Sequence, residues 1–244
     1  MLSKRKLKVF KSLQIKKYRQ QERMFMVEGA KGVEESLKST LKVRYLLLTE
    51  TFKNQLEDSN IPLLGEVEVV SEKELKSAGT FSSNNAGLAV LEMPDHNISY
   101  STEGIILALD DVRDPGNLGT IIRIADWYGV TQIICSKETA DFYNPKVINA
   151  TMGSFTRVQV SYQDLNSFFA ENTMPVYGAL LSGQSIYQKE LPMHAVVLMG
   201  NESKGISPQM ERFVNHPIRI PGRGGAESLN VAIATAVVLD NFFR

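Results

Sequence analysis

The stretch Ile105–Leu109, followed by Asp114-Pro115-Gly116-Asn117-Leu118-Gly119 and by Arg123, decides the fold class of this chain. Its five apolar residues predict a buried strand, and the residues after it predict a helix over 118–128 that Gly129 closes in the C′ position. Asn117 lies where the N-cap of that helix is expected, and helical spacing turns Arg123 away from the core face. A strand, a polar loop and a helix in this order are the start of a parallel α/β unit.

The same alternation of strands and helices continues to the end of the chain, and it predicts a mainly parallel sheet with helices on both faces. Further strands are expected at 132–135, 158–160, 176–180, 195–199 and 217–220, and further helices at 146–152, 165–171, 209–213 and 229–243.

Two more polar loops follow predicted strands of this sheet. Gly200-Asn201-Glu202, with Gly205, comes directly after 195–199, and Glu227-Ser228-Leu229-Asn230 lies beyond 217–220. Ligands of open α/β sheets bind beyond the carboxyl ends of the strands, so the three loops together suggest one composite site. Taken singly, each loop is equally compatible with an ordinary polar turn.

The last loop is rich in glycine, with Gly222, Gly224 and Gly225 ahead of Glu227. It does not fit a dinucleotide fingerprint, because the third glycine position falls on Glu227 and too little chain follows for a ribose-binding acid. A P-loop also fails, because no Gly-Lys-Ser/Thr ends the loop. Free backbone N–H groups near a helix start still suit an adenine, a ribose or a carboxylate.

Residues 1–95 predict a smaller α/β unit that begins with an uninterrupted basic helix. A strand is expected at 25–29, a helix at 33–41, strands at 43–48, 67–70 and 87–91, and a helix at 71–77. Ser71 and Glu74 fit a capping box at the start of that last helix. We expect a linker at 96–104, which divides the chain into domains 1–95 and 105–244.

Charge is unevenly distributed although the net charge of the 244 residues is zero. Residues 1–24 carry nine Lys/Arg and one acid, for a net charge of +8, and the remainder carries −8. A basic arm on an acidic body suggests a contact with a polyanion. The alternatives are a solvated amphipathic helix, with Leu7, Val9, Phe10 and Leu13 on its inner side, and a mitochondrial transit peptide, which the dominance of lysine disfavours.

Composition excludes several other classes. No apolar run reaches the length of a transmembrane helix, and no apolar region follows the basic start as in a secretory signal, so a cytoplasmic protein is expected. The single cysteine, Cys135, lies in an apolar run and is expected to be buried and inert. The three histidines share no spacing with one another or with acids, so neither a metal site nor a nucleophilic triad is predicted.

Taken in order, the three loops resemble the SpoU (TrmH) family of RNA ribose 2′-O-methyltransferases, in the SPOUT superfamily. The stretches that carry the resemblance are 109–123, Met199-Gly200-Asn201-Glu202-Ser203-Lys204-Gly205-Ile206, and Ile220-Pro221 through Ser228-Leu229-Asn230-Val231. The first domain is similar, more loosely, to the family's small RNA-binding domain, mainly over Arg23 to Gly29. Gly222 and Ala232 depart from the family pattern, which often has Met and Ser there.

The resemblance implies a parallel α/β sheet whose C-terminal part forms a trefoil knot, a homodimer, and S-adenosyl-L-methionine as cofactor. The cofactor contacts would fall on five positions: Met199, Gly200, Ile220, Ser228 and Leu229. The polar catalytic residues of the family pattern would be Asn117, Arg123, Glu202, Ser228 and Asn230.

The implied reaction is methylation of a ribose 2′-hydroxyl in ribosomal or transfer RNA. A guanidinium is effectively always protonated, so we expect Arg123 to bind a phosphate and stabilise the developing alkoxide rather than act as a base. Two rivals remain: a knotted enzyme that methylates an RNA base, and a non-catalytic RNA-binding protein that keeps the fold.

Overall fold

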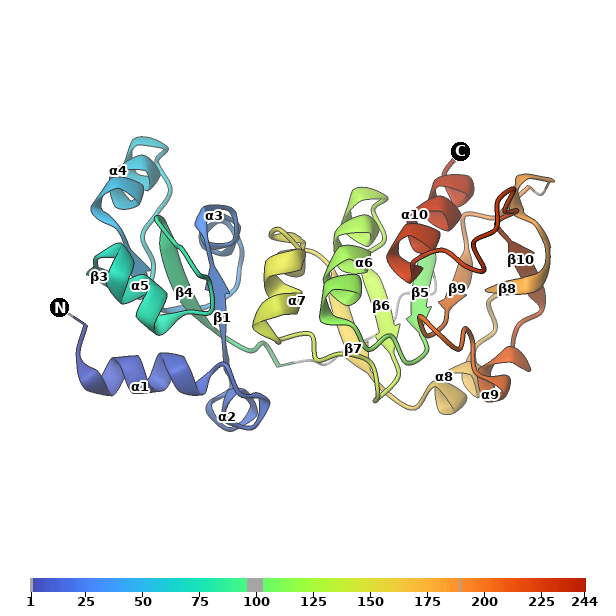
Figure 1. Cartoon of the computed structure of the whole chain (residues 1–244), viewed down its shortest axis with the longest axis horizontal. Helices are drawn as coiled ribbons and strands as arrows, with labels where there is room; N and C mark the ends of the chain where they lie inside the picture. The colour runs from blue at the N-terminus through green and yellow to red at the C-terminus, as the bar shows by residue number, and fades with distance from the viewer. Residues whose placement is uncertain (1, 96–102, 189) are drawn as a thin grey trace. The chain divides into compact units, whose positions relative to one another are not determined.

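A computed structural model describes residues 2–95, 103–188 and 190–244 (Figure 1). The chain forms two compact units. The N-terminal unit combines Met1–His96 with Asp141–Thr156, and the C-terminal unit combines Asn97–Ala140 with Arg157–Arg244. The segment Asp141–Thr156, which the sequence assigns to the second domain, thus clusters with the first. Most of the expected linker, residues 96–102, lies outside the described residues.

The N-terminal unit is built on a four-stranded sheet in the order β1-β4-β2-β3. β4 runs antiparallel to both of its neighbours, and β2 runs parallel to β3. Its elements are α1 (Lys4–Ser12), α2 (Lys16–Glu22), β1 (Met24–Glu28), α3 (Ala30–Lys38), β2 (Val43–Leu48), α4 (Glu50–Asp58), β3 (Glu66–Val69), α5 (Glu72–Ala78), β4 (Gly87–Glu92) and α7 (Pro145–Ala150).

Local signals predict most of this unit. The apolar run at β2 has the expected bounds, and the capping box of Ser71 and Glu74 at α5 is confirmed. One expectation is wrong, and one element was missed. The basic helix is broken into α1 and α2, and the helix α4, which Thr49 caps through the Phe52 N–H, was not expected.

The segment Asp141–Thr156 packs on β1. The ring of Phe25 lies 4.8 Å from the ring of Tyr143 and 6.1 Å from that of Phe155, between centroids. The buried Arg19 guanidinium donates a 2.6 Å hydrogen bond to the Asp141 carboxylate. Aromatic burial and an ion pair therefore hold this segment within the N-terminal unit, and no periodicity in the sequence signals either contact.

The C-terminal unit is built on a six-stranded, wholly parallel sheet in the order β10-β8-β9-β5-β6-β7. Its strands are β5 (Ile105–Leu109), β6 (Gln132–Cys135), β7 (Gln159–Tyr162), β8 (Val176–Ser185), β9 (Ala195–Met199) and β10 (His216–Arg219). Its α-helices are α6 (Pro115–Trp127), α8 (Leu165–Glu171), α9 (Pro208–Glu211) and α10 (Val231–Phe242). The expectation of an α/β fold with a parallel sheet and helices is confirmed.

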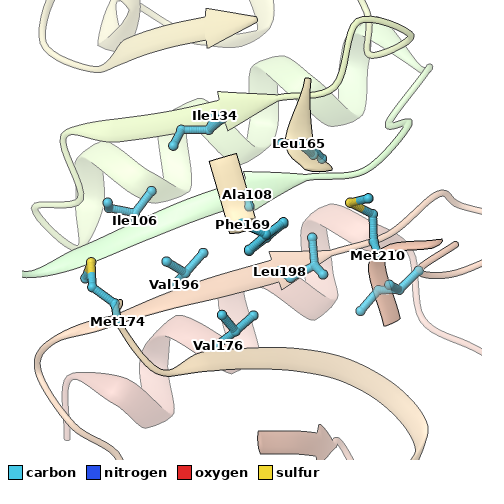
Figure 2. Close-up of a cluster of buried hydrophobic side chains, with 11 residues drawn as sticks. Ile106, Ala108, Ile134, Leu165, Phe169, Met174, Val176, Val196, Leu198 and Met210 are labelled. Carbon is cyan, nitrogen blue, oxygen red and sulfur yellow. The ribbon is translucent and has the colours of Figure 1, made fainter. Parts of the chain in front are cut away.

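One face of this sheet carries a core that α8 and α9 cover (Figure 2). Alternate residues of β5 and β9 point into it, as a two-residue strand period requires. The cluster includes Ile106, Ala108, Ile134, Leu165, Phe169, Met174, Val176, Val196, Leu198, Ile206 and Met210. The intervening residues of β5 and β9 are also buried, which explains why both strands read as unbroken apolar runs.

The helix α6 corrects one sequence prediction. It begins at Pro115, and its N-cap is Asp114, whose carboxylate accepts from the Asn117 N–H. Asn117 is therefore in the first turn and is not the cap. Gly129 follows the helix with φ +72°, as expected for C′.

Cys135 is buried on β6, as expected. Burial raises the pKa of its thiol, so this group is held protonated and unreactive. None of the helices among the described residues is both long and apolar enough to cross a membrane.

Candidate functional site

The loops after β5, β9 and β10 meet at the carboxyl edge of the parallel sheet. The Asn117 side-chain amide donates to Glu202 Oε1 at 3.0 Å, and the Asn230 amide donates to Asn117 Oδ1 at 2.9 Å. These three residues are up to 113 positions apart in the chain. Two side-chain hydrogen bonds therefore join the three loops in one cluster, with Asn117 at its centre.

The start of α6 orients this cluster. Asp114 Oδ1 accepts from the Asn117 N–H at 2.8 Å, which caps the helix and holds Asn117 in its first turn. The Asp114 N–H donates to the same Glu202 Oε1 at 3.3 Å. Glu202 Oε1 thus receives two donors, whereas Oε2 makes no hydrogen bond within the described residues.

Asn230 fixes the start of α10. Its Oδ1 accepts from the N–H groups of Ala232 and Ile233, at 2.9 and 3.3 Å, so it is the N-cap. The carbonyl end of its amide therefore caps one helix while the nitrogen end binds Asn117 on another. The helix expected to begin at Leu229 instead begins at Val231.

The loop after β9 is closed on itself. Asn201 and Gly205 exchange two backbone hydrogen bonds of 2.9 Å. A Cβ atom on Gly200 would lie 2.1 Å from Gly205 C and from Ile206 N, so only glycine fits there. The Asn201 amide also donates to the carbonyl of Asp111 at 2.7 Å, which ties this loop to the one after β5.

Arg123 lies two turns along α6 from the cluster and is exposed. Its side chain makes no ion pair or hydrogen bond with any residue in the described part of the chain, including Asn117 and Glu202. Its guanidinium is thus available to an anionic ligand.

The loop between β10 and α10 has a different character. Across 220–229, no backbone or side-chain group makes a hydrogen bond within the described residues, and 222–229 are exposed. Gly222, Gly224 and Gly225 have open space where a Cβ would stand. Ser228 and Leu229 extend from this loop, and Leu229 is an exposed apolar side chain. Ten residues of unpaired backbone and an exposed leucine suit a ligand with both polar edges and apolar surface.

Comparison with known families identifies the family of this chain. The model of the SpoU rRNA Methylase family matches residues 104–240, which is more than half of the chain. The chain belongs to the SpoU rRNA methylase family. Residues 4–85 match a second model, the MRM3-like substrate binding domain. The expected family is confirmed.

Several SpoU relatives match over nearly the full chain. The 23S rRNA (guanosine(2553)-2′-O)-methyltransferase RlmP of Bacillus subtilis is 31% identical over 96% of this chain and 94% of its own. Among solved structures, a protein of the TrmH family from Porphyromonas gingivalis is 37% identical. It has a TM-score of 0.87 and covers 99% of this chain and 98% of its own. An AdoMet-bound rRNA methyltransferase from Sinorhizobium meliloti is 31% identical, with a TM-score of 0.85 and coverage of 99% and 95%.

Three residues at this candidate site were not predicted from the sequence. Asp114 was predicted to be a loop residue. Proline is preferred at the first position of a helix, so Pro115 was the sequence signal that Asp114 is the N-cap. Asp110 is buried, and its Oδ2 accepts from the Ser207 N–H at 2.7 Å. The Arg113 Nε donates to Asp111 Oδ1 at 2.6 Å, and this hydrogen bond raises the pKa of the Arg113 guanidinium.

The residues expected from the sequence at the candidate site are thus unevenly connected. Asn117, Glu202 and Asn230 are joined by hydrogen bonds, whereas the side chains of Arg123 and Ser228 make no hydrogen bond to them. Met199 ends β9, where its carbonyl accepts from the Asp110 N–H at 2.9 Å, and Gly200 follows it. Ile220 begins the unpaired loop. No group of His, Cys, Asp and Glu that could hold a metal occurs among the described residues.

Proposed function

We propose that this protein transfers a methyl group from S-adenosyl-L-methionine to a ribose 2′-hydroxyl of ribosomal RNA. Membership of the SpoU family and the names of the relatives support the reaction class. The observation that carries the proposal is the cluster of Asn117, Glu202 and Asn230, together with the unpaired side chain of Arg123 farther along α6.

The cofactor would lie against the loops after β9 and β10. The unpaired backbone of 220–229 offers donors and acceptors to the edges of an adenine and a ribose, and Leu229 offers apolar surface. We propose Met199, Gly200, Ile220, Ser228 and Leu229 as the contacts. When bound, S-adenosyl-L-methionine supplies a methyl group on a good leaving group, so positioning contributes much of the rate.

Arg123 would act on the RNA. A guanidinium keeps its proton at any physiological pH, so it cannot remove the proton of the 2′-hydroxyl. Its five N–H donors can bind a neighbouring phosphate and stabilise the negative charge that develops on the 2′-oxygen. The proton would pass to that phosphate or to water.

Asn117 and Asn230 are better described as positioning residues than as catalytic ones. The side-chain oxygen of Asn117 accepts from Asn230, and its side-chain nitrogen donates to Glu202. The side-chain oxygen of Asn230 caps α10. Glu202 Oε2, by contrast, is free to accept a hydrogen bond from a ribose hydroxyl. We therefore assign the contact with the ribose to Glu202 and Arg123.

The hydrogen bond between the side chains of Asn117 and Asn230 predicts how substitutions of these two residues combine in their effect on kcat. Asn117→Ala removes both side-chain hydrogen bonds, and Asn230→Ser keeps a helix cap but removes the bond to Asn117. We expect each change to lower kcat about tenfold, because the reacting groups lose their support. The double variant should be little worse than either single one, because both remove the same link.

A double-mutant cycle on the rate of methyl transfer measures this coupling. Thermal melting of each variant serves as the control for folding. Multiplicative effects of the two substitutions would show that the residues act independently and would refute the positioning role.

We further propose the trefoil knot and the homodimer that the resemblance implies. The loop that leaves β10 at the edge of the sheet ends at Asn230, which binds the first turn of α6, so the chain must cross back over intervening strands. Trp127 on α6 and Ile233 on α10 are exposed apolar side chains on two helices that pack together. Light scattering would test the dimer. A ribosomal RNA substrate would place the enzyme in the cytoplasm.

Mapping the methyl group tests the function. Unmodified 23S and transfer RNA transcripts are incubated with the protein and S-adenosyl-L-methionine and are then hydrolysed by alkali. A 2′-O-methyl group leaves one alkali-resistant position in ribosomal RNA, because the 2′-oxygen is the nucleophile of that cleavage. Resistance only in transfer RNA would reassign the substrate, and labelled RNA without resistance would indicate base methylation. Binding of RNA without transfer would indicate a non-catalytic protein.

A further inference from the structure

The cations of residues 1–24 divide into two groups. Three are engaged within the protein: Lys6 binds Glu66 and Glu68, Arg19 binds Asp141, and Arg23 binds Asp95. The other six are exposed and make no ion pair within the described residues: Lys4, Arg5, Lys8, Lys11, Lys16 and Lys17. The excess positive charge of the arm is thus directed to solvent.

Three of these cations form a row on α1. At 100° per residue, Lys4, Lys8 and Lys11 lie within about 60° of one another, and they extend over about 10 Å of the helix. The opposite side of α1 is inserted into the core of the N-terminal unit, where Phe10 and Leu13 are fully buried. The row is therefore presented outward by a helix that cannot rotate.

The corner between α1 and α2 is held from inside. Arg19 is only 2% exposed. Its guanidinium donates to the Leu13 carbonyl at 2.9 Å and to Asp141 at 2.6 Å. Both helices are thus anchored to one buried group, which reduces the conformational entropy that a ligand would have to remove from this surface.

An aromatic side chain lies among the cations of α2. Tyr18 is exposed and follows directly on Lys16 and Lys17. Cations that track a phosphate backbone, together with an aromatic ring on which a base can stack, are typical of surfaces that bind single-stranded nucleic acid.

We propose that the outer face of α1 and α2 binds the backbone of a single-stranded RNA segment, outside the catalytic site. Lys4, Lys8 and Lys11 contact phosphates, and Tyr18 stacks on a base. This inference rests on the proposed function, because it names the surface that retains the RNA substrate. A membrane surface fits less well, because the apolar side of α1 is buried in the protein and is not available for insertion.

The test compares two triple variants of the full-length chain. The first, Lys4→Gln/Lys8→Gln/Lys11→Gln, removes the row. The matched control, Lys31→Gln/Lys38→Gln/Lys53→Gln, removes the same charge from lysines of the same unit that pair with Glu35, Glu34 and Glu57. Binding to a labelled 20-nucleotide oligouridylate and to a 23S ribosomal RNA transcript is measured between 0.05 and 0.2 M salt.

Each phosphate contact contributes about 0.7 to the slope of log K against log salt for a single strand. Loss of the row should lower that slope by about 2 and weaken binding roughly 100-fold at 0.1 M salt, and the control should change little. Tyr18→Ala should weaken oligouridylate binding about tenfold with the slope unchanged.

Equal effects of the two triple variants would overturn the proposal, because they would show a dependence on net charge alone. Wild-type binding of both RNAs by the variant that lacks Lys4, Lys8 and Lys11 would also overturn the proposal. In that case the proposed function would stand if the wild-type protein still methylates 23S RNA. A wild-type protein that binds neither RNA would overturn both. Unchanged affinity for S-adenosyl-L-methionine in the row variant, measured by calorimetry, establishes that a loss of RNA binding is local.

Discussion

Replacement of Arg123 by alanine is expected to lower the rate of methyl transfer by at least about 10²–10³-fold, while binding of S-adenosyl-L-methionine is retained. The guanidinium has no partner within the described residues, so its removal leaves no buried group unsatisfied and should not affect folding. The loss should fall on kcat, because the charge that Arg123 stabilises develops only in the transition state. Single-turnover transfer of a labelled methyl group measures it, with calorimetry for the cofactor.

A second arginine of the same unit provides the control. Arg157 is exposed and pairs with Asp126 on α6 through bonds of 2.8–3.0 Å. Arg157→Ala removes an equal charge and a surface ion pair of small energy, so activity should be close to wild type. Turnover at the wild-type rate in Arg123→Ala would remove Arg123 from the mechanism.

Gly200→Ala is expected to abolish cofactor binding and activity together. The added methyl group would lie 2.1 Å from two backbone atoms of Gly205 and Ile206, and backbone cannot move aside as a flexible side chain can. The loop after β9 must open, which would break the paired hydrogen bonds of Asn201 and displace Glu202 from Asn117. Overpacking of this kind costs about 1–3 kcal/mol of folding stability, so the protein should still fold.

Calorimetry with S-adenosyl-L-methionine would measure at least a tenfold loss of affinity for this variant. Gly129→Ala is the matched control for stability, since φ is +72° there and no atom lies near the added Cβ. It should lower stability by about 1–2 kcal/mol through backbone strain without affecting the cofactor. If Gly200→Ala binds the cofactor as wild type does, the loop after β9 is not part of the cofactor site.

The two central strands β5 and β9 of the C-terminal unit were predictable because each is buried on both faces. Ile105–Leu109 and Ala195–Met199 are unbroken apolar runs with the bounds that the sequence indicates. The helix α8 likewise has its expected bounds, 165–171, and Asp164 caps it through the Asn166 N–H. Burial and capping leave a trace within a few residues, so a local reading of the chain recovers them.

The N-cap of α6 was predicted wrongly because two nearby residues are both suited to that position. Asp114 and Asn117 are both good N-caps, three positions apart, and Asp114 takes the role with Pro115 as the first helical residue. The choice bears on the site, because Asp114 supplies the capping oxygen and the side-chain amide of Asn117 bonds Glu202 and Asn230 instead. The break in the basic helix was also missed. The second helix, α2, buries Arg19, a residue that composition groups with the solvent-exposed cations.

Residues near one another in the chain thus specify the α/β class, the strands of the parallel sheet and the three polar loops, because strand burial and turn chemistry act over short distances. The side chains that meet in the site, and the assignment of Asp141–Thr156 to the N-terminal unit, depend on contacts between residues up to 122 positions apart. The same holds for the division of nine cations into three that form ion pairs within the protein and six that are exposed without one. Such contacts depend on how the packed elements are arranged in space, and only the tertiary structure decides them.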